Sequence, residues 1–203
     1  MNAKSLSEVR ICFLGESFVN GTGDKECLGW TGRICVNVNK KGYDITYYNL
    51  GVRRETSTEL KNRWLREVTY RLPKEYDGRV VFSFGVNDTT IENGKTRVNI
   101  ADSLKNIHDI LSATKQLYPV LMIGLSPCGD AAQNQRIANL DQEFALVCQQ
   151  LDIPYLNVFP TLIKSNIWIE EARNYDGAHP RAAGYAEFAQ IVDNWDAWLN
   201  WFK

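Results

Sequence analysis

The sequence has almost no net charge, because 23 Lys and Arg residues are balanced by 24 Asp and Glu residues in 203 positions. This balance provides no positive field for gripping phosphates, so we expect no nucleic-acid partner. Long apolar stretches are missing too, since no run reaches the roughly 18 residues that a membrane span needs. The first ten residues are polar and lack the apolar centre of a signal peptide. We therefore expect a cytoplasmic protein without stable membrane insertion.

Cysteine and histidine are also scarce. The five cysteines are odd in number and widely spaced, and they include no C-x-x-C pair. This pattern argues against a disulfide scaffold and against a zinc ribbon, and it favours several buried thiols in a reducing compartment. Only two histidines are present, His108 and His179, so any histidine chemistry must come from one of these two residues.

The composition is that of an ordinary globular chain, with 44% apolar and 23% charged residues. A chain of this length buries enough surface to fold without a metal or a disulfide, and we expect a single domain over residues 1–203. Five short apolar runs predict buried strands, and four of them stop at a glycine. These runs are Val9–Leu14, Asp44–Leu50, Arg79–Phe84, Pro119–Ile123 and Pro154–Phe159.

Amphipathic helical spacing fills the gaps between these runs. One helix follows a capping box at residues 56–59, another has an apolar stripe from Ile100 to Leu111, and the last runs from Pro180 to Phe202. Such alternation predicts an α/β fold, a three-layer α/β/α sandwich around a five-stranded parallel sheet. The expected strand order is the flavodoxin-like 2-1-3-4-5, with the active site beyond the carboxyl ends of the strands.

Two side chains could carry nucleophilic chemistry. Ser17 directly follows the first strand, and a serine needs an adjacent base to become a nucleophile. His179 lies just before the last helix, and Asp176, three residues earlier, can reach its Nδ1–H on a tight turn. The alternatives are a helix cap for Ser17 and a helix-start carboxylate for Asp176. His108 lies within a predicted helix, where a surface role is usual.

Two further residues could stabilise an oxyanion. Gly51, after the second strand, can bring its backbone N–H close to a ligand oxygen. Asn87, within Gly85-Val86-Asn87-Asp88 after the third strand, carries a neutral amide donor of the kind that stabilises developing negative charge. Ordinary turn chemistry also accounts for both residues.

In this order, the blocks around Ser17, Gly51, Asn87 and Asp176–His179 resemble the SGNH hydrolase superfamily, also called GDSL esterases or lipases. The resemblance covers residues 9 to about 190. It implies an enzyme that cleaves a small-molecule acyl ester, such as a short-chain ester, an acetylated carbohydrate or a lysophospholipid. It also implies a triad of Ser17, His179 and Asp176, and an oxyanion hole formed by the Ser17 and Gly51 N–H groups and the Asn87 amide. Neither a cofactor nor a metal is required by such a mechanism.

Two positions depart from the family pattern. Glu16 stands where the family has Asp, and its extra methylene would change the hydrogen bonds of the loop. Arg53 and Arg54 stand where small residues are usual, so they either favour anionic substrates or form a solvated pair at a helix start.

Other interpretations stay open. The glycine-rich loop at residues 15–23 could cradle a phosphate or a flavin in a flavodoxin-like binder, although it matches neither phosphate-binding consensus. A catalytically inactive relative that binds a sugar or lipid is a further alternative. The C-terminal aromatic cluster exceeds what one helix face can bury, so it either packs beneath a neighbouring loop or contacts a second subunit of a homo-oligomer. This cluster comprises Trp195, Trp198, Trp201 and Phe202.

Overall fold

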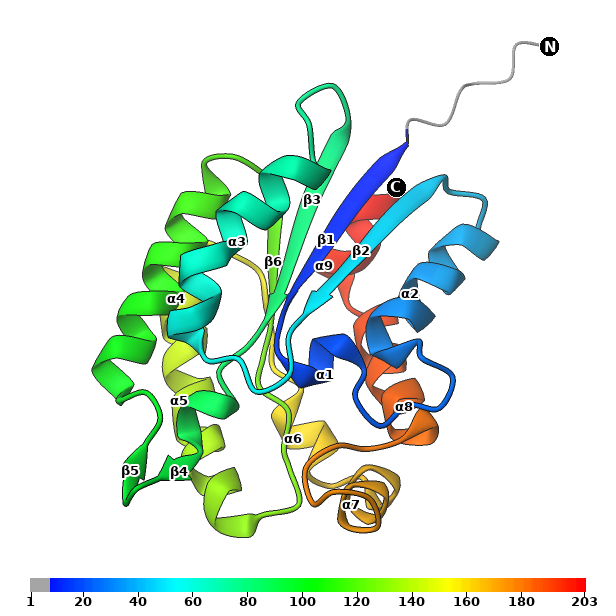
Figure 1. Cartoon of the computed structure of the whole chain (residues 1–203). Helices are drawn as coiled ribbons and strands as arrows, with labels where there is room; N and C mark the ends of the chain where they lie inside the picture. Colours follow the sequence, from blue (N-terminus) through cyan, green and yellow to red (C-terminus); the bar gives the residue numbers. More distant parts are fainter. Residues whose placement is uncertain (1–7) are drawn as a thin grey trace, which may run out of the picture.

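The computed structural model describes residues 8–203 and has a central parallel sheet between two layers of helices (Figure 1). The sheet order is β2-β1-β3-β6-β7. A separate antiparallel pair, β4 and β5, shifts the numbering, so the five strands of the large sheet follow the expected 2-1-3-4-5. The strands of the sheet are β1 (Val9–Gly15), β2 (Ile45–Gly51), β3 (Asp77–Ser83), β6 (Val120–Ile123) and β7 (Tyr155–Leu156), and the small pair is β4 (Ile91–Glu92) and β5 (Lys95–Thr96).

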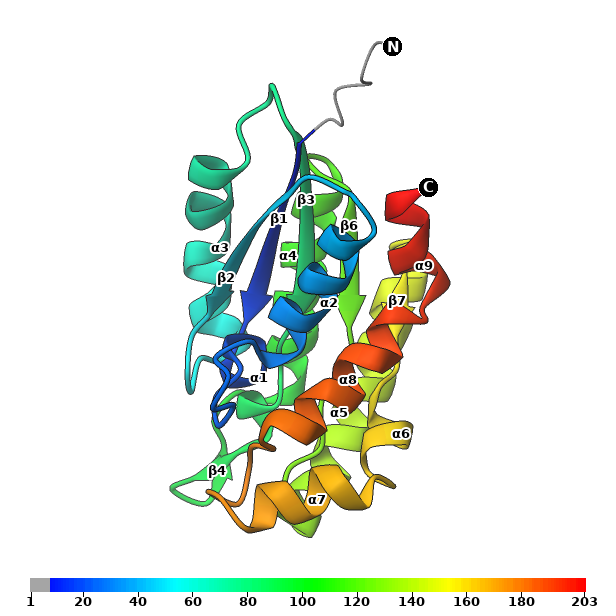
Figure 2. The same ribbon diagram turned by 90° about the vertical axis from the view of Figure 1, so that its right-hand side faces the viewer.

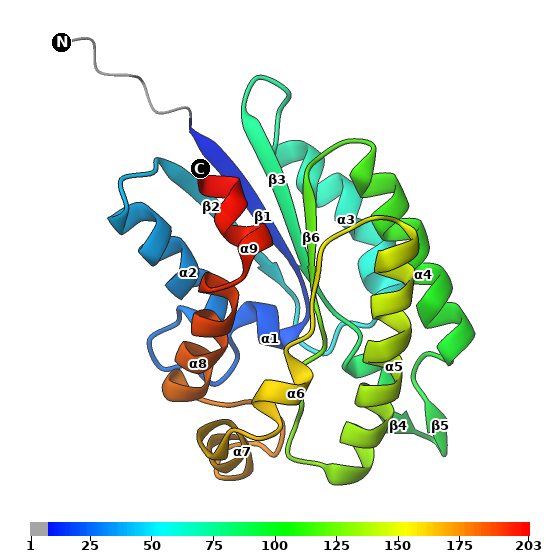
Figure 3. The same cartoon turned by 180° about the vertical axis from the view of Figure 1, so that it is seen from behind.

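Helices cover both faces of the sheet, as Figures 2 and 3 show. On one face α3 packs against α4 and α4 against α5, while on the other face α2 packs against α8 and α8 against α9. The helices are α1 (Ser17–Asn20), α2 (Gly29–Lys40), α3 (Ser57–Arg71), α4 (Ile100–Lys115), α5 (Ala131–Gln150), α6 (Phe159–Leu162), α7 (Asn166–Arg173), α8 (Ala182–Asp193) and α9 (Asp196–Leu199), with 3-10 turns η1 (Asn87–Thr89) and η2 (Asn200–Phe202).

Parallel register places the ends of three strands at one level. In the sheet, Gly15 at the end of β1 pairs with Gly51 of β2 on one side and with Ser83 of β3 on the other. The segments that follow these strands therefore begin side by side, at the lower end of the sheet in Figure 1. This edge is where the expected site residues lie.

The helix signals are largely confirmed, with local corrections. Thr56 caps α3 in the expected capping box, in which its N–H donates to Glu59 Oε2 at 2.8 Å. The stripe on α4 begins later than expected, because Ile100 is 54% exposed whereas Ile107 is fully buried. The last strand is shorter than expected, since the chain turns into α6 at Phe159.

The expected helix from Pro180 to Phe202 is broken. Helix α8 begins only at Ala182 and ends at Asp193, and the chain then turns before α9. This turn allows Trp198 to point into the core, where it is 1% exposed and packs 6.2 Å from the Phe13 ring. A continuous helix could not have buried this residue together with the α8 stripe.

The structure also bears on the expectations of free, buried thiols and of no membrane-spanning helix. Among residues 8–203 all five thiols are free and four of them are buried, but Cys27 is exposed. Within the same residues, no helix has the length and apolar character needed to cross a membrane.

Candidate active site

The nucleophile candidate Ser17 is positioned by the end of β1. Gly15 has a φ of +153°, and a Cβ at this position would lie 1.8 Å from the Ser83 carbonyl oxygen of β3. Only glycine therefore permits β1 and β3 to approach so closely at the turn. Glu16 then leads into α1, and Ser17 becomes the first residue of this helix, with 5% of its surface exposed.

The imidazole of His179 reaches Ser17 across 162 positions of sequence. Its Nε2 lies 2.6 Å from Ser17 Oγ, and its Nδ1 lies 2.7 Å from Asp176 Oδ2. The other carboxylate oxygen of Asp176 accepts hydrogen bonds from the backbone N–H groups of Ala178 at 3.0 Å and His179 at 2.8 Å. A single aspartate thus shapes the turn and holds the ring.

Burial and charge set the protonation of this chain of groups. Burial lowers the pKa of His179 below its usual value, the Asp176 carboxylate opposes this effect, and the positive charge of Arg53 adds to the lowering. Burial pushes the pKa of Asp176 upward, but the hydrogen bonds from His179 and Ala178 outweigh it and lower the pKa. At neutral pH the ring is therefore neutral, with its proton on Nδ1 facing Asp176 and Nε2 free to accept from Ser17.

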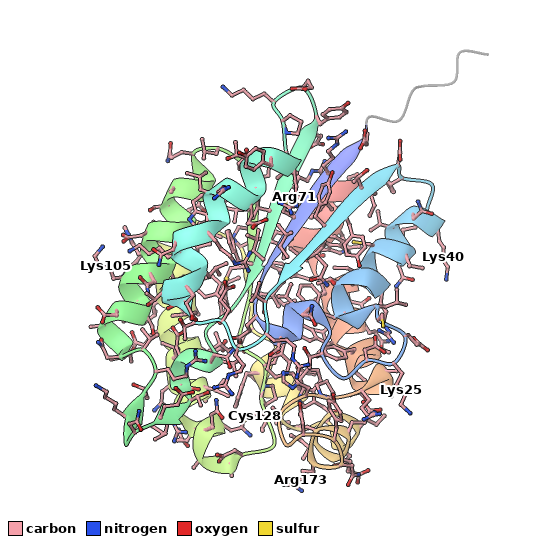
Figure 4. All side chains as sticks on the ribbon, viewed as in Figure 1. Lys25, Lys40, Arg71, Lys105, Cys128 and Arg173 are labelled. Atoms are coloured by element: carbon pink, nitrogen blue, oxygen red, sulfur yellow. The ribbon has the colours of Figure 1, made fainter. Side chains whose placement is uncertain are left out.

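Aromatic packing and a backbone hydrogen bond support the histidine. The Phe18 ring lies 4.9 Å from the His179 ring and stacks on Trp168 at 5.9 Å. Trp168 is fully buried, and its Nε1–H donates to the Pro127 carbonyl at 2.9 Å. The loop itself is tied to the segment after β6, because the Gly129 N–H donates to the Gly177 carbonyl at 2.8 Å. Cys128, the neighbour of Gly129, is labelled below the sheet in Figure 4.

Gly51 does not have the expected free N–H group. Its backbone N–H donates to the Asn49 side-chain oxygen at 3.0 Å, so it already has an acceptor. A Cβ on Gly51 would lie 2.2 Å from the Asn20 nitrogen at the end of α1, which shows that the glycine is needed for close packing. In this structure the Gly51 N–H therefore has an acceptor within its own strand, and the glycine also permits close packing against α1.

The Asn87 amide lies close to the nucleophile turn, but its donors are engaged as well. Nδ2 donates to Glu16 Oε2 at 2.7 Å and to the Glu55 carbonyl at 3.0 Å. Its neighbour Asp88 is buried and organises the loops around it, accepting from the Ser57 N–H at 2.8 Å and from Ser103 Oγ at 2.7 Å. Of the three expected oxyanion donors, the Ser17 N–H differs from the other two, because the first N–H of a helix has no partner within the helix.

The remaining charged candidates differ in their exposure and contacts. His108 lies on α4 with its side chain 54% exposed, beside Asp109 at 3.7 Å, as a surface histidine does. Arg54 has a φ of +66° and forms an ion pair with Glu92 at 3.0 Å, whereas Arg53 is exposed and has no ion-pair partner among residues 8–203.

Sequence reasoning underrated Glu16, which is 2% exposed and joins the nucleophile turn to the Asn87 loop. The feature of the sequence that pointed to Glu16 was its departure from the Asp of the family pattern. Within residues 8–203 no cluster of three or more His, Cys, Asp or Glu side chains is arranged to hold a metal ion.

The chain matches the GDSL-like Lipase/Acylhydrolase family over residues 13–187. The chain belongs to this family. It is accordingly a carboxylic ester hydrolase, and its central sheet with flanking helices is the fold of the family. No curated protein matches the chain in a sequence search.

Solved structures of distant sequence share this fold. A lipase/acylhydrolase from Enterococcus faecalis has a TM-score of 0.72 at 17% identity, covering 91% of this chain and 93% of its own. A catalytic mutant of an acetylxylan esterase from Geobacillus stearothermophilus has a TM-score of 0.74 at 14% identity, covering 97% and 98%. An α/β hydrolase from the metagenome of Lake Arreo, Spain, has a TM-score of 0.72 at 16% identity, covering 91% and 92%.

Proposed function

We propose that the GDSL hydrolase acts through Ser17 as nucleophile, His179 as general base and Asp176 as the carboxylate that orients the imidazole. The observation that carries this proposal is the unbroken chain of contacts, 2.6 Å from Ser17 Oγ to Nε2 and 2.7 Å from Nδ1 to Asp176 Oδ2. Both distances lie within the range in which a base can take a proton directly.

The reaction follows from these positions. Nε2 removes the Ser17 proton as Oγ attacks the acyl carbonyl, and the resulting imidazolium is stabilised by Asp176. The imidazolium then protonates the leaving alcohol, which leaves the acyl group bound to Ser17. A water molecule activated by the same Nε2 attacks this acyl-enzyme and releases the acid.

The negative charge that develops on the carbonyl oxygen needs donors beside Ser17. The backbone N–H of Ser17, at the start of α1, is the first of these. The Asn87 amide is the second, and to serve it must exchange one of its two present partners for the oxyanion. The Gly51 N–H is the third, and to serve it must likewise exchange its present partner, the Asn49 side-chain oxygen at 3.0 Å.

The proposed substrate is a small acyl ester, with short-chain esters, acetylated carbohydrates and lysophospholipids as the three classes to be compared. The acetylxylan esterase among the structural relatives supports the inclusion of acetylated sugars. A phosphate or flavin site in the loop at residues 15–23 is less well supported, because its glycines serve packing. A Cβ on Gly21 would lie 2.8 Å from Gly29, and one on Gly23 would lie 2.6 Å from the Pro180 carbonyl.

A hydrolysis panel tests the proposal. Nitrophenyl esters of rising chain length, acetylated xylo-oligosaccharides and a lysophospholipid are assayed with the wild type and with Ser17→Ala. We expect the variant to lose about 10³-fold or more in kcat/KM on every substrate that the wild type cleaves. Undiminished turnover by Ser17→Ala, with the same fold by circular dichroism, would exclude Ser17 as the nucleophile.

A further inference from the structure

The carboxyl group of Glu16 is buried among donors only. It is 2% exposed, and Oε1 accepts from the Val86 N–H at 3.0 Å. Oε2 accepts from the Asn87 N–H at 3.1 Å and from Asn87 Nδ2 at 2.7 Å. Among residues 8–203 no Lys or Arg forms an ion pair with it. Three N–H groups are therefore what balances this charge.

The Asn87 amide has no hydrogen to spare. A primary amide carries two N–H hydrogens, and here one faces Glu16 and the other faces the Glu55 carbonyl. Both neighbours are oxygen acceptors, which fixes the amide with its nitrogen toward them. An oxyanion at Ser17 can receive a hydrogen bond from Asn87 only if one of these two bonds is given up.

The two bonds differ in strength. The bond to Glu16 is the shorter one, and when the carboxylate is ionised it is assisted by charge, which makes it about twice as strong as a neutral bond. When Glu16 is protonated this assistance is lost. The acid proton also finds no acceptor among its three partners, all of which are donors.

We propose that Glu16 is a positioning residue that competes with the reaction oxyanion for the Asn87 amide. The ionised carboxylate holds the amide back, and the protonated carboxyl group releases it to the acyl carbonyl. This inference rests on the proposed function of Ser17 and Asn87, and it adds a group next to the nucleophile that the triad does not use.

The charges around Glu16 place this competition at alkaline pH. Burial raises the pKa of Glu16 to about 8, and the negative charge of Asp88 in η1 adds to this effect against the opposing hydrogen bonds from Asn87 and Val86. On the side of α3, the Glu55 carboxylate is paired with Arg63 at 2.5 Å. On the side of α8, the charge of Asp176 is engaged by His179 at 2.7 Å.

The test is the pH dependence of kcat, measured in a pH-stat from pH 5.5 to 9.5 with a saturating neutral short-chain ester. In the wild type, kcat should decline above about pH 8, by roughly tenfold one pH unit above the midpoint. KM should change much less, because the oxyanion forms only in the transition state. Circular dichroism across the same range shows that the fold is retained.

Two variants separate this inference from a purely structural role. Glu16→Gln has no charge at any pH, and in Glu16→Asp the side chain is one methylene shorter, so we expect its carboxylate to lie farther from Nδ2. Both should lose the alkaline decline. If neither variant folds, Asn87→Ala is sufficient, because without the amide the kcat should be low at all pH values and show no decline near pH 8.

The results of these measurements distinguish failure of the Glu16 inference from failure of the proposed function. The inference is overturned if wild-type kcat stays flat to pH 9.5, or if the decline persists with the same midpoint in Asn87→Ala or in a folded Glu16→Gln variant. The proposed function fails separately, through undiminished activity of Ser17→Ala. Hydrolysis that depends on Ser17 but shows no alkaline decline would reject only the role of Glu16.

Discussion

The substitution Asp176→Asn gives a sharp test of the triad, because it changes one of three hydrogen bonds and leaves two. The amide oxygen of the variant can still accept from the Ala178 and His179 backbone N–H groups, at 3.0 and 2.8 Å in the wild type. The turn should therefore keep its shape. The third contact, from Nδ1 to Oδ2 at 2.7 Å, becomes a contact between two nitrogens that both carry hydrogen.

The ring can relieve this clash by moving its proton from Nδ1 to Nε2. Nε2 then donates toward Ser17 Oγ, 2.6 Å away, and can no longer take the serine proton. The change of tautomer, together with the loss of the carboxylate charge beside the imidazolium, should lower kcat by about 10³–10⁴-fold, the size of effect found when a triad aspartate is replaced by its amide. This corresponds to about 4–5.5 kcal/mol in activation free energy.

The assay is kcat at pH 7.5 on the best ester from the hydrolysis panel, with thermal unfolding as the control for the turn. We expect the melting temperature to stay within a few degrees of the wild type, since both bonds to Oδ1 remain. A loss of less than tenfold in kcat, in a variant that melts like the wild type, would refute the assignment of Asp176 as the residue that orients His179.

Three further predictions concern the surroundings of the site and the core. The acid limb of the pH profile of kcat/KM should have its midpoint below pH 6.5, because His179 must be neutral to act and its pKa is lowered. The Arg53→Gln variant removes one cause of this lowering and should move the midpoint upward. The control variant Arg66→Gln, on the exposed face of α3, should leave the midpoint unchanged. An unmoved midpoint in Arg53→Gln contradicts this coupling. The Trp168→Phe variant leaves the buried Pro127 carbonyl without its donor, so the free energy of unfolding, measured with denaturant, should fall by about 1–3 kcal/mol. Equal stability of variant and wild type would show that this hydrogen bond contributes nothing. The Ile107→Ala variant should lose about 2–5 kcal/mol in the free energy of unfolding and Ile100→Ala less than about 0.5 kcal/mol, because only Ile107 is buried. Similar losses in the two variants would contradict the placement of Ile107 in the core and Ile100 at the surface.

The sequence predicted the architecture because its signals are local. Short apolar runs ending at Gly15, Gly51 and Gly124 predict strands, and the capping box at Thr56 predicts the start of α3. The corrections also have local causes. Ile100 is the first residue of α4 and is exposed there, and the break after Asp193 redirects Trp198 into the core.

For the site, the sequence could nominate the residues but not their hydrogen-bond partners. The order of Ser17, Asn87 and Asp176–His179 along the chain was sufficient to nominate them, since parallel strands bring their carboxyl ends to one edge. By itself the sequence could not say which acceptor each N–H group would choose. Asn87 bonds to Glu16, which lies 71 positions away in the sequence, because of positions set by several segments at once, and a shift of about 1 Å would break this bond.

The sequence alone therefore determined the α/β order, the family and the residues that could perform ester hydrolysis, because these depend on spacing and on residue type. Only the tertiary structure decided that His179 lies 2.6 Å from Ser17 and that Glu16 contacts the Asn87 amide. The physical reason is that hydrogen bonds are short and directional, so the partners of a donor are settled by the packing of chain segments that lie far apart in sequence.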